Sequence, residues 1–247
     1  MAPGGGAPSL LIDGGTGLRR VSALCADQPF RGTILLSHLH WDHTQGLPFF
    51  EAGARPDHRV DVLLPAPDGD ALAVLARGFS PPHFPIGPEA LGEGWTFGQL
   101  VEGRTEREGF RILVREIPHK GGQTFGFRVE HSGKTFAYLS DHAPLNLGPG
   151  ADGQGALHEA ALELADGADV LIHDAQFLGR EFPGVAFLGH ASIEYACGLA
   201  DAAAVRRLAL FHHAPSRTDD AIAAIVEALP PTKAEVVAAC DGLEMRL

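Results

Sequence analysis

The sequence is poor in cysteine, in basic residues and in long apolar runs, and each scarcity excludes a class of protein. Its three cysteines, Cys25, Cys197 and Cys240, are widely spaced and odd in number. A secreted disulfide framework is therefore not expected, and we predict reduced thiols, with Cys197 and Cys240 in the core, and a cytoplasmic location. No apolar run approaches the ~20 residues of a membrane-spanning helix, and the first residues lack the basic and apolar regions of a secretory signal.

The shortage of basic residues restricts the partners that the chain can bind. Lys and Arg number 19 against 31 Asp and Glu, which gives a net charge of −12. A large nucleic acid needs clustered Lys and Arg, so we expect neither it nor a membrane as a partner. We expect a small-molecule substrate. An anionic substrate is compatible with the acidic chain, because bound divalent cations would offset the protein's negative charge at the site. A homodimer is left open. The length of 247 residues fits a single domain over 1–247 with an ample core.

Histidine, by contrast, is abundant, and it is concentrated after one short apolar run. The chain has 13 histidines, and the buried strand predicted at 33–36 is followed at once by four metal-capable side chains: His38, His40, Asp42 and His43. Imidazole and carboxylate suit zinc-like ions. In an extended segment His38 and His40 point to the same side. One tetrahedral site needs only three of the four side chains, which hints at a second metal ion.

This H-x-H-x-D-H pattern resembles the signature of the metallo-β-lactamase-fold hydrolases, and the resemblance covers nearly the whole chain. It implies an α/β fold, a four-layer αββα sandwich, with its amino-terminal edge shortened because little precedes Ser9. The later segments are closest to the small phosphodiesterase and tRNA 3′-processing branch. In this family an Asp at the position of Asp13 braces the histidine loop; an ordinary Asp-Gly turn is the alternative.

The resemblance implies three further ligands. His119 precedes a G-F-R strand as the third histidine of this branch does, and Asp141 stands where the family has a carboxylate that bridges two metals. His212 ends an apolar strand, although a shift of one residue would select His213. His38, His40 and His119 would hold one ion, and Asp42, His43 and His212 the other. We expect two divalent ions roughly 3.5–4 Å apart, zinc first, with manganese or iron as alternatives.

Two other segments suggest the chemistry. Gly189-His190-Ala191-Ser192 resembles a short segment whose histidine, paired with a carboxylate, protonates the leaving group in that branch. The expected catalytic residues are therefore His190, as general acid, and Asp42. A helix-entry histidine bonded to backbone is the alternative for His190. The segment Leu171-Ile172-His173-Asp174-Ala175 resembles another family segment, with Asp174 replacing Glu.

These features predict a binuclear metal-dependent phosphodiesterase acting on a small cyclic nucleotide or another phosphodiester by attack of a hydroxide that bridges the metals. The chain shows neither the basic arm of a tRNA 3′-end nuclease nor the inserted domain of a β-CASP nuclease. His40 stands where flavodiiron proteins have Glu, which disfavours redox chemistry. A lactone, thioester or other ester hydrolase is the alternative enzyme, and a metal-binding protein without turnover is the third possibility.

The remaining pattern predicts strands in runs followed by strands alternating with helices, typical of an α/β sandwich. A helix is expected over 68–78 with Asp68 as its cap, and a hairpin about 131–134. The Pro-rich stretch 79–86 is interpreted as a loop packed by its phenylalanines, with a pocket rim as the alternative. Further strands are expected at 9–12, 60–65, 95–101, 110–117, 170–173, 208–211 and 236–240. Further helices are expected at 157–165, at 192–203 with Ser192 as its cap, and at 218–229 with Thr218 as its cap.

Overall fold

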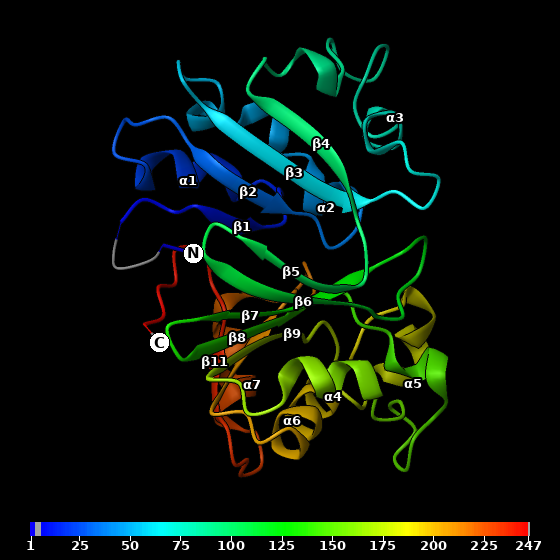
Figure 1. Cartoon of the computed structure of the whole chain (residues 1–247). Helices are drawn as coiled ribbons and strands as arrows, with labels where there is room; N and C mark the ends of the chain where they lie inside the picture. Colours follow the sequence, from blue (N-terminus) through cyan, green and yellow to red (C-terminus); the bar gives the residue numbers. More distant parts are fainter. Residues whose placement is uncertain (3–5, 247) are drawn as a thin grey trace. The chain divides into compact units, whose positions relative to one another are not determined.

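The computed structural model describes residues 1–2 and 6–246, and this part of the chain divides into two compact units. Unit 1 comprises residues 1–101 with 106–109, and unit 2 comprises residues 102–105 with 110–247. Figure 1 shows the elements of both units along the chain. The prediction of one domain over 1–247 stays a prediction.

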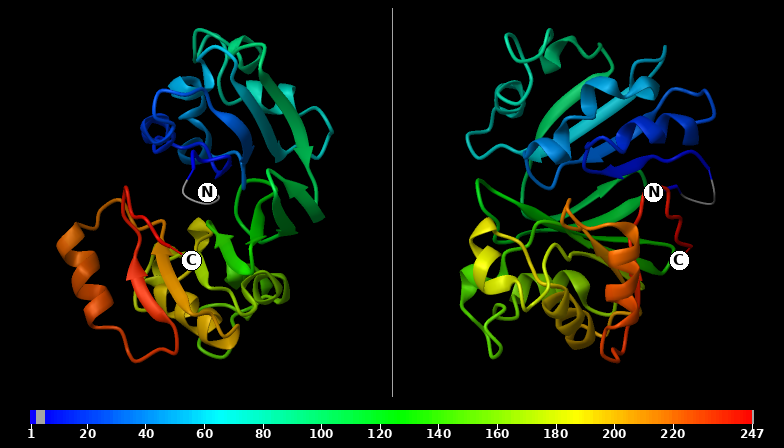
Figure 2. Two further views of the ribbon diagram at one scale, coloured as in Figure 1. Left: turned by 60° about the vertical axis from the view of Figure 1, so that its left-hand side comes forward. Right: turned by 180° about the vertical axis from the view of Figure 1, so that it is seen from behind.

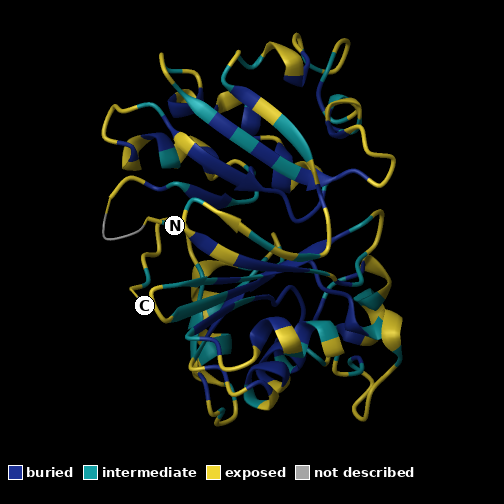
Figure 3. Ribbon diagram, viewed as in Figure 1, coloured by how far each residue is buried: buried dark blue, intermediate teal, exposed yellow. Residues whose placement is uncertain are grey.

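Unit 1 is built on a parallel sheet. Its strands pair in the order β1 (Leu10–Ile12), β2 (Arg31–Leu35), β3 (Arg59–Pro65) and β4 (Trp95–Leu100). Four consecutive residues of β2, from Gly32 to Leu35, are buried, as expected for an inner strand of a parallel sheet. Figure 3 shows the buried segments of these strands in dark blue.

Short helices connect these strands and close the core of unit 1. They are α1 (Leu18–Leu24), α2 (Trp41–Thr44), α3 (Ala71–Ala76) and the 3₁₀ turns η2 (Leu47–Phe49), η3 (Glu51–Gly53) and η4 (Pro88–Ala90). The side chain of Asp70 accepts a hydrogen bond from the Ala73 N–H, so α3 is capped by Asp70 and not by Asp68 as predicted. The stretch 79–86 is a packed loop, because the Phe84 ring contacts Phe79 and Phe49 with centroids 6.0 and 5.8 Å away.

Unit 2 is built on a mixed sheet. Its strand order is β11-β10-β9-β8-β7-β6-β5. Their bounds are β5 (Gly103–Arg107), β6 (Phe110–Glu116), β7 (Phe125–His131), β8 (Lys134–Leu139), β9 (Val170–Asp174), β10 (Arg207–Phe211) and β11 (Glu235–Ala238). The predicted hairpin joins β7 to β8, whereas β8, β9, β10 and β11 run parallel to one another. Figure 2 shows β11 and its neighbour β10 in red and orange.

Helices cover one face of this sheet. They are α4 (Glu159–Ala165), α6 (Ile193–Ala202) and α7 (Asp219–Glu227), with the shorter α5 (Phe182–Val185), η5 (Pro144–Leu147) and η6 (Ala186–Leu188) in the loops. Strand residues such as Leu139 and Leu171 belong to the same buried cluster as Leu164 of α4. Ser192 caps α6 and Thr218 caps α7, as their sequences predict.

Several sequence-based expectations need correction. Helices α1 and α5 and strand β5 were not anticipated, because they are short and have no clear apolar periodicity. Cys240 is exposed and not part of the core, since it follows the edge strand β11, while Cys197 is buried. In the described part of the chain, no helix is long and apolar enough to span a membrane.

Asp169 gives a test of the packing in unit 2. Its carboxylate accepts the Thr135 N–H at 3.0 Å and an Arg206 N–H at 2.9 Å, and the Thr135 bond is the main reason that its pKa is lowered. Asp169→Asn should therefore lower the free energy of unfolding at pH 7 by about 1 kcal/mol.

The pH dependence follows from the lowered pKa in the folded state. The stabilisation is present above the unfolded pKa of Asp and disappears as the pH falls through the folded pKa. The difference between wild type and Asp169→Asn in urea unfolding should therefore shrink in acid. Asp166→Asn, an exposed neighbour, is the control; a difference that stays constant down to low pH would contradict the assignment.

Candidate metal centre

In unit 1, parallel pairing of β1 with β2 brings Asp13 beside the histidine loop. Asp13 directly follows β1, and Ser37 lies two residues beyond β2. The Asp13 carboxylate accepts the Ser37 N–H at 2.7 Å, the Ser37 hydroxyl at 2.9 Å, and the Nδ1–H of His43 at 2.7 Å. Asp13 therefore braces the loop, and the alternative of an ordinary Asp-Gly turn is set aside.

These bonds fix the proton positions on two imidazoles. The Ser37 hydroxyl gives its proton to Asp13, so it accepts a hydrogen bond from Nδ1 of His38 at 3.0 Å. His43 likewise holds its Nδ1 proton toward Asp13. Both rings then keep the lone pair on Nε2, which is the form of imidazole that binds a metal ion. The residues present therefore fit the metal that the sequence predicts.

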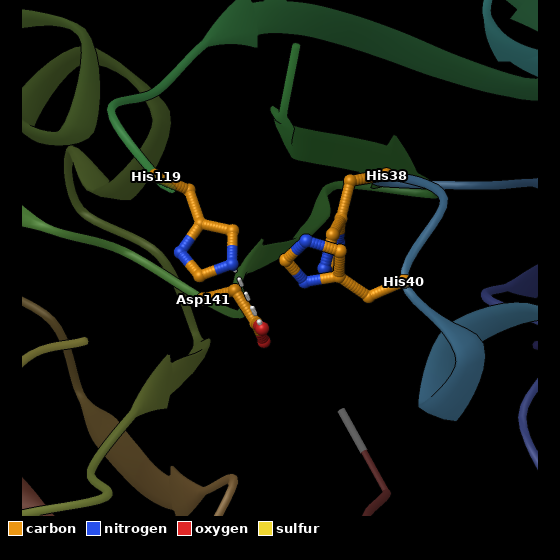
Figure 4. A group of neighbouring side chains, drawn as sticks. All are labelled: His38, His40, His119 and Asp141. Atoms are coloured by element: carbon orange, nitrogen blue, oxygen red, sulfur yellow. Dashed lines mark ion pairs between the residues drawn. The ribbon is translucent and has the colours of Figure 1, made fainter. Parts of the chain in front are cut away.

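The four donors of the H-x-H-x-D-H segment gather at one place in unit 1. The ring of His38 lies 4.5 Å from that of His40 and 4.2 Å from that of His43, centroid to centroid. Figure 4 shows that His38 and His40 come from the same loop after β2. Asp42 and His43 belong to α2; the His43 ring is buried, whereas the Asp42 side chain is 55% exposed.

Glycine lets the segment after Asp13 approach this loop. A Cβ on Gly15 would lie only 2.1 Å from the carbonyl oxygen of Asp42, so no other residue fits there without a shift. The Gly14 N–H donates to the His43 carbonyl at 2.7 Å, and the Gly46 N–H donates to the Gly14 carbonyl at 2.8 Å. The run of glycines after Asp13 thus locks the backbone of the histidine loop.

In unit 2, three adjacent parallel strands end at one edge, and each end carries a candidate residue. Asp141 follows β8, Asp174 is the last residue of β9, and His212 follows β10. Nε2 of His212 lies 3.3 Å from Asp141. The ligand atoms of Asp141, Asp174, His190 and His212 all lie within 4.8 Å of one another, close enough to hold a metal ion.

His119 completes this group from the loop after β6. Its Nδ1 donates to the Gly189 carbonyl at 2.6 Å, so its Nε2 lone pair faces Asp141, 3.4 Å away. The dashed line in Figure 4 marks this pair of side chains. His213 instead bonds to the carbonyl of Ala239 at 3.3 Å, on β11's side. The geometry therefore favours His212 over His213 as the residue directed at Asp141.

Gln176 is a contributor that sequence reasoning missed. Its side-chain amide lies 2.9 Å from Nδ1 of His212 and fixes the plane of that ring. The amide NH₂ faces Nδ1 and donates to it, whereas an amide turned by 180° presents its oxygen and supports the tautomer with the lone pair on Nε2. No sequence signal marks Gln176, because it follows β9 by two residues and meets His212 only through strand pairing.

His190 forms a dyad with Asp174. Nδ1 of His190 lies 2.8 Å from the Asp174 carboxylate, which also accepts the N–H groups of His142 and Gln176. Asp174 is fully buried. The His190 ring stacks on that of His212, with centroids 4.9 Å apart and planes 20° apart. The carboxylate orients His190, and its Nε2 remains available to carry a proton.

Behind this dyad lies a buried histidine pair that the sequence did not reveal. Nδ1 of His142 lies 3.0 Å from Nε2 of His173, whose Nδ1 donates to the Asp174 carbonyl at 2.7 Å. Both rings are fully buried, and this burial lowers the pKa of each. The neutral pair ties the end of β8 to the end of β9, which holds Asp141 and Asp174 in place.

Three of the candidate positions adopt left-handed backbone. The φ angles are +62° at Asp13, +54° at Asp141 and +55° at His212. Non-glycine residues rarely adopt this region, although Asp and His enter it more readily than most. Each position is the sharp turn at which a strand ends, and the turn redirects the side chain to its partners.

The chain also matches known proteins. A family model described as the beta-lactamase superfamily domain matches residues 9–213. The chain belongs to the metallo-β-lactamase superfamily. It is 28% identical over 235 residues to a ribonuclease Z of an Exiguobacterium strain, covering 82% of this chain and 78% of the relative. It is 30% identical over 220 residues to a ribonuclease BN of Salmonella paratyphi C, covering 76% and 72%.

A solved structure agrees at the level of the fold. A new diphosphatase from the PhnP family superposes with a TM-score of 0.69 at 17% identity, over 96% of this chain and 79% of that one. The predicted family, its α/β sandwich fold class and the assignment to the hydrolases are thus confirmed. Members of this superfamily bind divalent metal ions, and the chain carries a His/Asp cluster of the right chemistry.

Asp13 gives a test of the loop geometry. Asp13→Asn keeps the size of the side chain but removes the charge that holds the protons of His43 and Ser37. We expect the affinity for zinc to fall by about 10–100-fold, as for other residues that orient metal ligands. Competition with a chromogenic chelator measures the change.

Asp57→Asn is a matched control, because exposed Asp57 has a φ of +63° and suffers the same backbone strain as Asp13. Its zinc affinity should equal that of the wild type. An equal zinc affinity for Asp13→Asn would contradict the bracing role.

Proposed function

We propose that this protein is a binuclear metal-dependent phosphodiesterase that acts on a small phosphodiester, including a cyclic nucleotide. One observation carries the proposal: His190, oriented by buried Asp174, lies beside His212 and Asp141. A proton donor next to candidate metal ligands suits a reaction in which an alkoxide leaves. The names of the relatives, ribonucleases and a diphosphatase, support cleavage of phosphorus–oxygen bonds.

We further propose which residues hold the two ions. His38, His40 and His119 would hold one ion, Asp42, His43 and His212 the other, and Asp141 both. Imidazole with carboxylate suits zinc, and manganese or iron can occupy the same ligands. When bound, two such ions lower the pKa of the attacking water and stabilise the charge that develops on the phosphoryl oxygens.

Side chains of the protein carry out the proton transfer. His190 carries it on Nε2 while Asp174 holds Nδ1–H, which stabilises the charged ring and fixes its direction. Water adds OH to phosphorus, the bond from phosphorus to the leaving oxygen breaks, and His190 gives its proton to that oxygen. The second proton of the water restores His190. Asp42, in the first turn of α2, is proposed as the second catalytic residue.

The substrate and the setting follow from the charge and the thiols. A net charge of −12 disfavours a long nucleic acid, so we propose a small anionic substrate, with no membrane and with a homodimer left open. Cys25, Cys197 and Cys240 are unpaired, which suits a reducing compartment such as the cytoplasm.

A substrate panel tests the proposal. The protein is loaded with zinc or manganese, and elemental analysis should give about two equivalents. It should hydrolyse bis-p-nitrophenyl phosphate with a higher kcat/KM than any lactone or thioester. Asp141→Asn should lower kcat/KM on the order of 100-fold, while Asp152→Asn, an exposed residue of the same unit, should not. A preference for lactones or thioesters would make the protein an ester hydrolase, and no turnover would leave a metal-binding protein.

His190→Ala tests the general acid. It should lower kcat on the order of 10²–10⁴-fold for a phosphodiester with an alkoxide leaving group. The loss should be small for p-nitrophenolate, which departs without a proton. Both metal ions should stay bound, as elemental analysis checks.

His131→Ala is the control, because His131 is a half-buried histidine at the end of β7. Its kcat should match that of the wild type for both leaving groups. Equal losses for both leaving groups in His190→Ala would remove His190 from the acid role, and loss of metal would make it a ligand.

A further inference from the structure

A cavity of about 840 Å³ lies wholly within unit 1, next to the histidine loop. Its walls come from three segments: the start of α1, residues 41–54, and the packed loop 78–84. Its volume falls in the range of ~300–1,000 Å³ that is usual for small-molecule sites. Phe79, His83 and Phe84 of the packed loop line this cavity. Their place at the rim of the active-site pocket stays a prediction.

Most of the apolar part of the lining is aromatic, with Pro48 and Ala54 as the other members. Five aromatic side chains contribute: Trp41, Phe49, Phe50, Phe79 and Phe84. Of the described residues that line the cavity, none is Leu, Ile, Val or Met. Trp41 is 68% exposed and Phe49 is 54% exposed, whereas Phe50 and Phe79 are buried. Flat faces held open to solvent suit a planar ring, whereas an acyl chain would be expected to meet branched aliphatic side chains.

The polar part of the lining suits a ring that carries hydrogen-bonding groups. It consists of Thr16, Arg19, Thr44, Gln45, Glu51 and His83. Gln45 and Glu51 offer an amide and a carboxylate, the groups that pair with the edges of nucleobases. Arg19 is exposed on α1 and supplies a cation for a phosphate. A purely apolar aromatic compound would leave these groups unused.

The cavity is joined to the candidate metal centre by the chain itself. Trp41 stands between His40 and Asp42, and Thr44 and Gln45 follow His43 directly. Helix α2 thus carries candidate ligands and cavity wall within a single turn.

We infer that this cavity binds the nucleobase of the substrate, so that the phosphodiester of the proposed function, on which this inference rests, is a nucleotide. Trp41 and Phe49 supply the stacking faces. Helix α2 and the loop 79–86 thus select the substrate, and the residues described above carry out the reaction.

Calorimetric titration of the metal-loaded protein tests the inference without turnover, because adenosine 5′-monophosphate has no phosphodiester bond. It should bind about 5- to 150-fold more tightly than ribose 5-phosphate, the fold-change that one stacked base contributes. Phenyl phosphate tests for any aromatic ring and should bind less tightly than the nucleotide. Octanoate, a probe for an acyl chain, should not compete.

Two variants locate the site. Trp41→Ala and Phe49→Ala should each lower the affinity for adenosine 5′-monophosphate toward that for ribose 5-phosphate. The affinity for ribose 5-phosphate should not change. Phe49 lies outside the H-x-H-x-D-H segment, so its variant stays informative if Trp41→Ala disturbs the metal content. Phe187→Ala is the matched control, because Phe187 is 69% exposed and belongs to unit 2. It should bind both compounds as the wild type does.

Each other outcome overturns the inference. Equal affinities for adenosine 5′-monophosphate and ribose 5-phosphate would exclude a nucleobase site, and so would equal affinity for phenyl phosphate. Competition by octanoate would identify an acyl pocket. The proposed function fails separately: nucleotide binding that depends on Trp41, without hydrolysis of bis-p-nitrophenyl phosphate, would keep this site and reject the phosphodiesterase.

Discussion

Neighbouring parallel strands end at the same edge of a sheet, and this constraint decides where the candidate ligands of each unit lie. In unit 1 the pairing of β1 with β2 sets Asp13 beside Ser37 and the histidine loop. In unit 2 the run β8, β9, β10 sets Asp141, Asp174 and His212 side by side, although 71 positions separate the first from the last. The chemistry therefore depends on strand register, because a slip of one residue would turn each of these side chains to the other face.

Strand register places the candidate ligands, and hydrogen bonds to their side chains then fix the orientation of each ring. Asp13 fixes protons on His43 and, through Ser37, on His38; the Gly189 carbonyl does so for His119. These partners are the Asp13 carboxylate, which three hydrogen bonds hold, the buried Ser37 hydroxyl and a backbone carbonyl. The imidazoles are consequently held in the metal-binding form before any ion arrives, and binding requires little rearrangement.

The features that could be predicted from the sequence are those that depend on residues close together in the chain. The H-x-H-x-D-H segment, the hairpin of β7 and β8 and the caps Ser192 and Thr218 depend on residues a few positions apart, so local rules describe them. Local rules do not describe contacts made through the sheet. The hydrogen bond between Gln176 and His212 and the one between His142 and His173 both depend on strand pairing between residues more than 30 positions apart. The choice between His212 and His213 likewise needed the left-handed turn after β10, and the exposure of Cys240 needed the position of β11 at the sheet edge.

The left-handed backbone at Asp13, Asp141 and His212 sets local stability against the proposed function of these side chains. Glycine adopts such a φ at no steric cost, so a change to glycine at any of the three would relieve local strain. The same change would delete a brace, a proposed bridging carboxylate or a proposed ligand. A laboratory selection that rewards only heat resistance would thus be drawn toward folded, inactive proteins at these three positions.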